Sequence, residues 1–89
     1  MNKLEQARVT IDEIDQQIAS LFKSRMLAVM DVLEFKKSNH LPILDSKREA
    51  EMIARNVKRF DSKELEPYYE QLLKTILEIS RQYQEDHYE

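Results

Sequence analysis

The chain of 89 residues contains no glycine, no cysteine and no tryptophan. Without glycine it has neither a phosphate-cradling loop nor a dinucleotide-binding fingerprint, because both need close backbone approach. Without cysteine it has no disulfide, no catalytic thiol and no thiolate-bound zinc. Its two histidines, His40 and His87, lie far apart and have no partner ligands near them in the sequence. The sequence therefore predicts neither a metal nor a cofactor.

Long apolar runs are also missing. No run approaches the roughly 20 residues of a membrane span, and the first five residues lack the core of a signal peptide. We therefore expect a soluble cytoplasmic protein. The net charge of −3 argues against non-specific binding of nucleic acid, which needs a basic patch. Basic side chains nevertheless gather in residues 1–60, with 11 basic against 9 acidic, whereas residues 61–89 carry 3 against 8.

The spacing of apolar residues predicts an all-α fold with one long and two shorter helices. From Leu4 to Phe35 apolar residues recur every three or four positions, and the segment Ser38–Pro42 is typical of a loop that ends a helix. No strand-like alternation is present. A first helix of about 35 residues would be about 50 Å long, whereas a compact chain of this size is roughly 30 Å across. The chain cannot cover such a helix itself, so we predict an intertwined helical homodimer.

The second helix is predicted to start near Asp45–Ser46 and to run to about Val57. Ser46 and Glu49 have the spacing of a capping box, in which each side chain satisfies a backbone donor of the first turn. The third helix is predicted to begin at Pro67, since proline suits the first helical position. Residues 1–89 are thus read as one helical domain.

A few polar residues interrupt the apolar pattern. Arg25 occupies the position between Leu21 and Ala28 where an apolar residue is expected, and a cation there is costly unless an anion meets it. Lys36 lies about 20° round the helix from Arg25 and about 16 Å further along, so the two share a face. Arg8 is turned roughly 100° away, toward a different neighbour.

Other polar groups join them on the second and third helices. Ser80 and Gln84 form a polar pair on or beside the apolar stripe of the third helix, and Arg48 and Glu49 follow the start of the second. Taken singly, these residues have ordinary structural explanations: an interface ion pair for Arg25, common polar helix residues for Ser80 and Gln84, and a capping box with solvated charge for Arg48 and Glu49. Together they predict a pocket for a small, doubly anionic molecule, because guanidinium groups grip carboxylates bidentately.

In this order the residues resemble the all-helical class of chorismate mutase, either a monofunctional enzyme or the mutase module of a bifunctional one. The resemblance covers almost the whole chain and rests on Arg8, Asp15, Arg25, Lys36, Asp45-x-x-Arg48-Glu49 and Ser80-x-x-x-Gln84. It implies an isomerase of the shikimate pathway that converts chorismate to prephenate for phenylalanine and tyrosine biosynthesis, without a cofactor. It also implies a homodimer with two equivalent pockets.

The resemblance implies catalytic roles for Arg25, Lys36 and Gln84. Lys36 and Gln84 would donate hydrogen bonds to the ether oxygen of the substrate, and Arg25 would hold a carboxylate. Arg8 would clamp a carboxylate across the dimer interface.

The remaining roles that the resemblance implies concern the substrate ring. Glu49, with the Asp45 region, would take the ring hydroxyl. Arg48 and Ser80 would support the ring carboxylate, partly through water.

Three other interpretations remain open. Isochorismate pyruvate lyases share the fold and the cations of the first helix, but the element formed here by Asp45, Arg48 and Glu49 distinguishes the mutase. The chain could instead be a non-catalytic helical module that docks on or regulates another aromatic-pathway enzyme, and a mutase could also dock in this way. A generic coiled-coil adaptor would explain the apolar spacing but leave Arg25, Lys36 and Gln84 unexplained.

Overall fold

The computed structural model describes residues 1–88, which form three α-helices and no strand. The helices are α1 (Lys3–Ser38), α2 (Ser46–Phe60) and α3 (Glu66–Asp86). The predicted all-α class, with one long and two shorter helices, is confirmed. Glu89, the last residue of the predicted domain, lies outside the described residues. No helix in this part of the chain is long and apolar enough to cross a membrane.

The start of α2 differs from the prediction. Its N-cap is Asp45, whose carboxylate accepts a hydrogen bond of 3.0 Å from the backbone N–H of Arg48. Ser46 is already helical, so the predicted capping box between Ser46 and Glu49 is wrong. An aspartate at this position both accepts the backbone donor and places a negative charge at the positive end of the helix dipole. Glu49 is thereby left available for other contacts.

The ends of the shorter helices also shift slightly. α2 runs to Phe60, three residues past the expected Val57, because its basic last turn suits the negative end of the helix dipole and nothing interrupts it before Asp61. α3 begins at Glu66, one residue before Pro67. Proline has no backbone N–H, but the first turn of a helix leaves its N–H groups unpaired in any case, so Pro67 is tolerated there.

Two residues other than glycine have a positive φ. His40 (φ 55°) follows the end of α1, and Asp61 (φ 57°) caps the end of α2. Asparagine, aspartate and histidine are the residues other than glycine most often found in this region. A chain that contains no glycine therefore reverses direction at these two residues.

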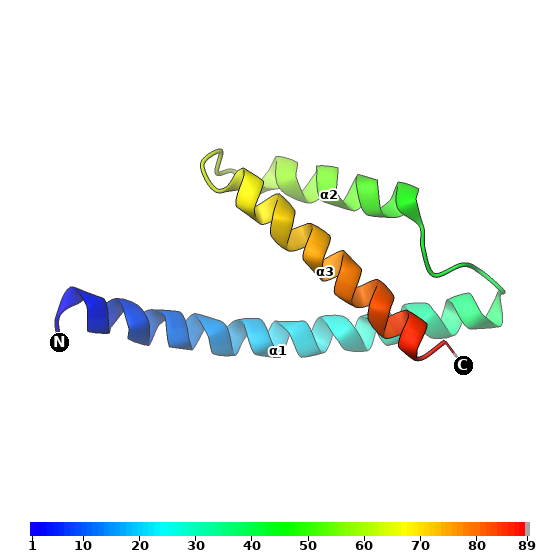
Figure 1. Ribbon diagram of the computed structural model, residues 1–89, viewed down its shortest axis with the longest axis horizontal. Helices are drawn as coiled ribbons and strands as arrows, with labels where there is room; N and C mark the ends of the chain where they lie inside the picture. The colour runs from blue at the N-terminus through cyan, green and yellow to red at the C-terminus, as the bar shows by residue number, and fades with distance from the viewer. Residues whose placement is uncertain (89) are drawn as a thin grey trace.

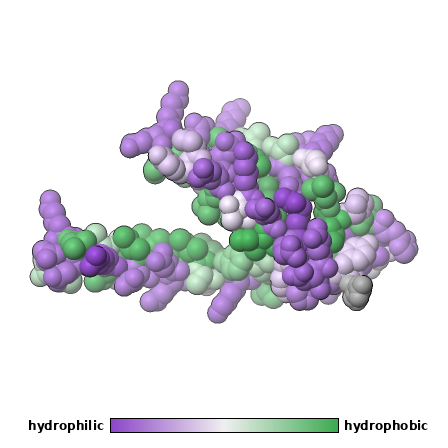
Figure 2. Space-filling model, in the orientation of Figure 1, coloured by the Kyte–Doolittle hydropathy of each residue, from purple (hydrophilic) through white to green (hydrophobic). Residues whose placement is uncertain are grey.

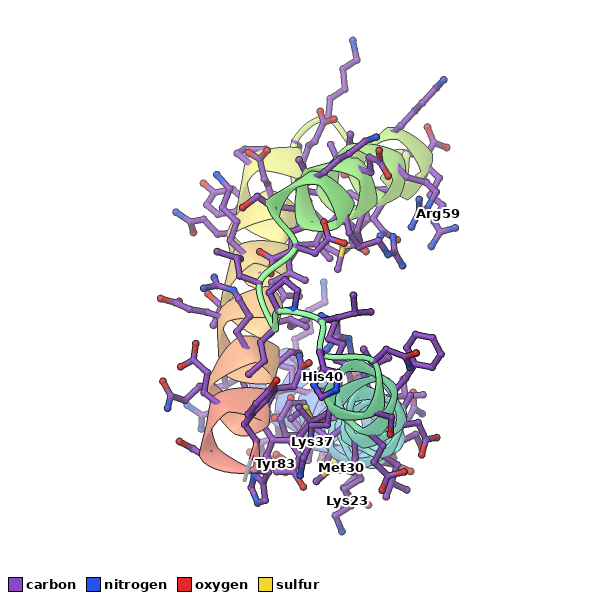
Figure 3. All side chains as sticks on the ribbon, turned by 90° about the vertical axis from the view of Figure 1, so that its right-hand side faces the viewer. Lys23, Met30, Lys37, His40, Arg59 and Tyr83 are labelled. Carbon is purple, nitrogen blue, oxygen red and sulfur yellow. The ribbon has the colours of Figure 1, made fainter. Side chains whose placement is uncertain are left out.

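α3 connects the other two helices. It runs beside α2 and then crosses the C-terminal half of α1 (Figure 1), and the end-on view shows it along one side of the molecule, reaching from α2 to α1 (Figure 3). Where α2 meets α3, the rings of Phe60 and Tyr69 stack with their centroids 4.1 Å apart. Among the described residues, only two large apolar side chains are buried, Leu33 of α1 and Leu73 of α3.

The N-terminal half of α1 has no neighbour within the chain (Figure 1). Its large apolar side chains are exposed and form a band along the helix (Figure 2), which includes Leu4, Ile11, Ile14, Ile18 and Leu21. The radius of gyration is 16.4 Å, against about 12 Å for a compact chain of this length. The accessible surface is 7417 Å², against roughly 5,500 Å² for a globular monomer of this mass. A single chain therefore leaves apolar surface that needs a partner, and the homodimer stays a prediction.

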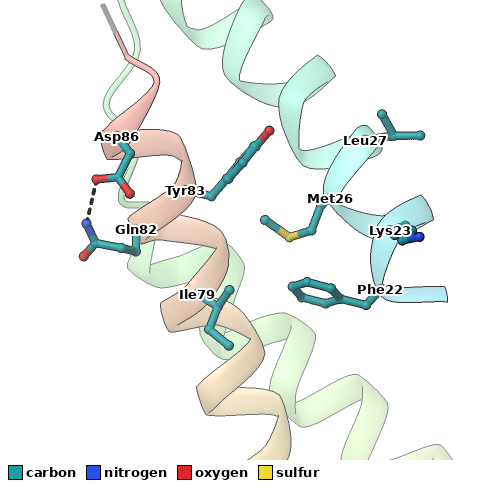
Figure 4. Close-up of a pocket in the computed structure, with 8 residues that line it drawn as sticks. All are labelled: Phe22, Lys23, Met26, Leu27, Ile79, Gln82, Tyr83 and Asp86. Carbon is teal, nitrogen blue, oxygen red and sulfur yellow. Dashed lines mark hydrogen bonds between the residues drawn. The ribbon is translucent and has the colours of Figure 1, made fainter. Parts of the chain in front are cut away.

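The exposed band continues into a groove of about 670 Å³ between α1 and α3. Figure 4 shows Phe22 and Met26 of α1 facing Ile79 and Tyr83 of α3 across this space. Its lining is mainly apolar, and its few polar side chains include Gln82, which donates a hydrogen bond of 2.9 Å to Asp86 of the same helix. The groove lacks a cluster of cations that could hold an anionic ligand.

Candidate active site

A second, more polar cavity of about 160 Å³ lies among the C-terminal half of α1, the loop after it, the start of α2 and the end of α3. It brings together seven of the eight side chains that the sequence singled out: Arg25, Lys36, Asp45, Arg48, Glu49, Ser80 and Gln84. Its apolar walls are Val29, Val32, Ile43, Met52 and Leu77. Residues up to 59 positions apart in the sequence therefore share one small site.

Arg25 connects α1 to α3 inside this cavity. Its guanidinium donates a short hydrogen bond to Oγ of Ser80, and that hydroxyl donates its own proton to the carbonyl of Ile76 at 2.8 Å. Ser80 is only 5% exposed, so the pair is largely shielded from water. The serine thus acts as an acceptor toward Arg25, which fixes the guanidinium within the cavity.

Burial affects the charge of Arg25. Desolvation disfavours the charged form and lowers the pKa of the guanidinium below its ordinary value. A cation whose pKa falls on folding destabilises the folded state wherever it remains protonated, and this cost disappears only in strongly alkaline solution. Arg25 therefore carries an unfavourable charge at neutral pH, which a bound anion would offset.

Lys36 lies near the end of α1, where the loop folds back over it. Its Nζ donates a hydrogen bond of 2.6 Å to the carbonyl of Ile43. This contact holds the ammonium at the cavity, and two of its three protons remain for other acceptors.

Gln84 is the most buried polar amide of the site, at 6% exposed. Its Nε2 donates to the carbonyl of Ser80 at 3.2 Å, which uses one of two amide protons. Its Oε1 is buried and has no hydrogen-bond partner among the described residues. A buried polar atom left without a partner costs about 1–3 kcal/mol, and a ligand that donated a hydrogen bond to this oxygen would remove that cost.

The start of α2 supplies the acidic side of the cavity. Asp45 caps the helix, and Arg48 follows within the first turn. Oε2 of Glu49 lies 3.1 Å from Nε of Arg81, a residue of α3 that sequence reasoning missed. The helical spacing of Leu77, Ser80 and Arg81 places all three on the face that lines the cavity, but nothing in the sequence distinguishes this arginine from an ordinary surface residue.

Arg8 is the one predicted residue that the structure does not bring to the cavity. It lies seventeen residues before Arg25 on the same continuous helix, which corresponds to about 25 Å along the axis. Its side chain is exposed in the half of α1 that has no neighbour. Within one chain, Arg8 and Arg25 cannot meet at the same small ligand.

The side chains of the cavity suit the binding of an anion. Four cations, Arg25, Lys36, Arg48 and Arg81, face two carboxylates, Asp45 and Glu49. The excess of positive charge matches a small ligand with two negative groups. Ser80 carries the only hydroxyl among the residues that line the cavity, and it donates to a carbonyl and not to a base. Within residues 1–88, no three histidines or carboxylates come close enough together to hold a metal ion.

Comparison with known proteins agrees with this chemistry. A family model described as chorismate mutase type II matches residues 7–85. The match covers all of α2, most of α1 and α3, and every residue lining the cavity. No curated protein and no solved structure gives a significant match.

Proposed function

The chain belongs to the chorismate mutase type II family, and from this premise we propose that it converts chorismate to prephenate in the cavity between α1, α2 and α3. The observation that supports this most strongly is that Arg25, Lys36 and Gln84 line one cavity, although they come from distant parts of the chain. The reaction would serve the biosynthesis of phenylalanine and tyrosine in the cytoplasm.

The proposed reaction is an intramolecular [3,3] rearrangement, which breaks an ether C–O bond while a C–C bond forms. It uses no nucleophile and no redox partner, so the protein has two tasks. It must hold the enolpyruvyl side chain over the ring in the reactive diaxial form. It must also stabilise the negative charge that grows on the ether oxygen as its bond breaks.

Lys36 and Gln84 perform the second task in this proposal. Each keeps at least one proton after its contact within the protein, to the carbonyls of Ile43 and Ser80 respectively. Both are held before substrate arrives, so little reorganisation is needed as charge develops. Arg25 performs part of the first task by binding a substrate carboxylate, which offsets the cost of burying its own charge.

The substrate ring lies against α2 in this arrangement. Glu49, with Asp45 beside it, accepts the hydrogen bond of the ring hydroxyl. Arg48 and Ser80 support the ring carboxylate, partly through water. Glu49 keeps lone pairs available for this purpose because no hydrogen bond engages its carboxylate within residues 1–88.

The second substrate carboxylate requires the homodimer. We propose that two chains intertwine through the apolar band of α1 and the groove between α1 and α3, and that the partner's Arg8 completes each cavity. The exposed apolar side chains and the excess of accessible surface over a globular monomer support this assembly. Each dimer then contains two equivalent sites.

The test of the proposed function is product analysis with purified protein, incubated separately with chorismate and isochorismate. Prephenate from chorismate would support the mutase. Pyruvate and salicylate from isochorismate would favour the lyase of the same fold instead. If neither substrate reacted while the protein remained a helical dimer, the proposal would fail and a docking role would replace it.

Gln84 gives the proposal a distinctive pH dependence. Glutamine donates its amide proton at any pH, whereas a glutamate must be protonated to donate. In Gln84→Glu we expect kcat at pH 7–8 to fall by about 10²- to 10³-fold, the usual cost of losing one such donor. Activity should return as the pH falls low enough to protonate the new carboxyl, whose ordinary pKa is about 4.3.

The measurement is kcat for chorismate between pH 4.5 and about 8. Gln71→Glu, on the exposed surface of the same helix, is the matched control and should follow the wild-type profile. If Gln84→Glu showed the wild-type pH profile, the assignment of Gln84 as a donor to the ether oxygen would be wrong.

A further inference from the structure

Arg81 is the charged side chain of the cavity to which neither the sequence pattern nor the reaction assigns a role. It lies on α3 one residue after Ser80, and its Nε is 3.1 Å from Oε2 of Glu49 on α2. This is the only ion pair among the described residues that joins two helices. Both side chains are partly buried, at 33% and 21% exposed, so the pair lies at the cavity rather than in bulk water.

The geometry of this pair leaves the carboxylate available. Nε of Arg81 is buried and close to Glu49, but it forms no hydrogen bond with it, so the N–H does not point along the line between the two atoms. The contact is therefore an ion pair held by charge. The lone pairs of Glu49 are not consumed and can accept a hydrogen bond from a ligand.

Charge explains why such a partner is needed. A free carboxylate facing a doubly anionic ligand would repel it, and a glutamate side chain on the first turn of a helix can rotate out to water. The cation of Arg81 opposes both effects, because it offsets the charge of Glu49 and attracts it to the α3 side of the cavity.

We propose that Arg81 is a positioning residue that holds Glu49 in place to accept the ring hydroxyl of the substrate. This inference rests on the proposed function. The ring hydroxyl takes no part in the bonds that break and form, so its recognition is equally strong in the bound substrate and in the transition state. Loss of such uniform binding raises KM and leaves kcat nearly unchanged.

The experiment compares kcat and KM for chorismate in the wild type and in Arg81→Ala, Arg81→Lys, Glu49→Ala and the double variant Arg81→Ala/Glu49→Ala. In Arg81→Ala we expect KM to rise about tenfold or more, with kcat within about twofold of wild type. Arg81→Lys should recover most of the loss, because it restores the charge. Since Arg81 acts through Glu49, the double variant should be no worse than Glu49→Ala alone.

Arg55→Ala is the matched control, since Arg55 is exposed on α2 and outside the cavity. It should keep the wild-type KM, and circular dichroism should show equal helix content in every variant. The inference is overturned if Arg81→Ala behaves like Arg55→Ala, if the two single effects add in the double variant, or if kcat falls instead of KM rising. If the wild type did not convert chorismate, both the proposed function and this inference would be overturned. If the wild type were active and Arg81→Ala kept the wild-type KM, the inference alone would be overturned.

Discussion

Replacing Lys36 with alanine is expected to lower kcat for chorismate by about 10²- to 10³-fold while the protein remains helical. The ammonium is held at the cavity by the carbonyl of Ile43, 2.6 Å from Nζ, and its two remaining protons are available to a ligand. In the proposed mechanism these protons meet the ether oxygen only as its charge develops, so the loss should appear mainly in kcat. Steady-state kinetics with circular dichroism on the same samples measures both properties.

Lys37→Ala provides the matched control for this prediction. Lys37 follows Lys36 directly, so it is turned about 100° round the helix, and it does not line the cavity. The Lys37→Ala substitution removes the same charge and the same side-chain volume as Lys36→Ala. It should leave kcat within about twofold of the wild-type value. If Lys36→Ala retained wild-type turnover, the assignment of the ether-oxygen donor would be wrong, and Arg25→Ala would then decide whether the cavity is the active site at all.

The helices could be predicted from the sequence because their apolar spacing is regular and long. The pattern from Leu4 to Phe35 is interrupted only at Arg25 and contains no proline or glycine, so it predicts a helix that begins and ends within a few residues of α1. The cap of α2 was harder to predict. Asp45 and Ser46 are both good capping residues, and the choice between them depends on where the loop from α1 delivers the chain.

The cavity residues could be recognised where they violate a pattern. Arg25 stands where an apolar residue belongs, and Ser80 and Gln84 interrupt an apolar stripe, so each signals a polar requirement inside the fold. Arg81 gives no such signal, because an arginine beside the stripe of a helix is ordinary surface composition. Its contact with Glu49 joins α3 to α2, and only the packing of these helices reveals it.

The homodimer is a prediction that the structure of a single chain does not test directly. The length of α1 predicts a partner because no 89-residue chain can cover about 50 Å of apolar helix. The structure agrees to the extent that this surface is exposed. The position of Arg8, about 25 Å along α1 from Arg25, gives the proposed dimer a chemical consequence that can be measured.

Refolding equal amounts of the Arg8→Ala and Lys36→Ala variants together is expected to restore activity that neither has alone. Each variant should lose turnover by itself, since every site of its homodimer lacks either the partner's arginine or its own lysine. Random pairing makes half of the dimers mixed. In a mixed dimer one site has both defects and the other has none, so about a quarter of all sites should regain wild-type turnover.

The control is the mixture of Arg25→Ala with Lys36→Ala. Both of these residues belong to the cavity of their own chain, so every site in a mixed dimer still carries one defect and no activity should return. The comparison thus depends only on which chain supplies Arg8, since both mixtures contain the same Lys36→Ala protein. Recovery in the first mixture alone would show that the arginine crosses the interface. Failure of both mixtures, with mixed dimers demonstrated by mass spectrometry, would place Arg8 outside the site, and the second substrate carboxylate would then have to bind to a cation of the same chain.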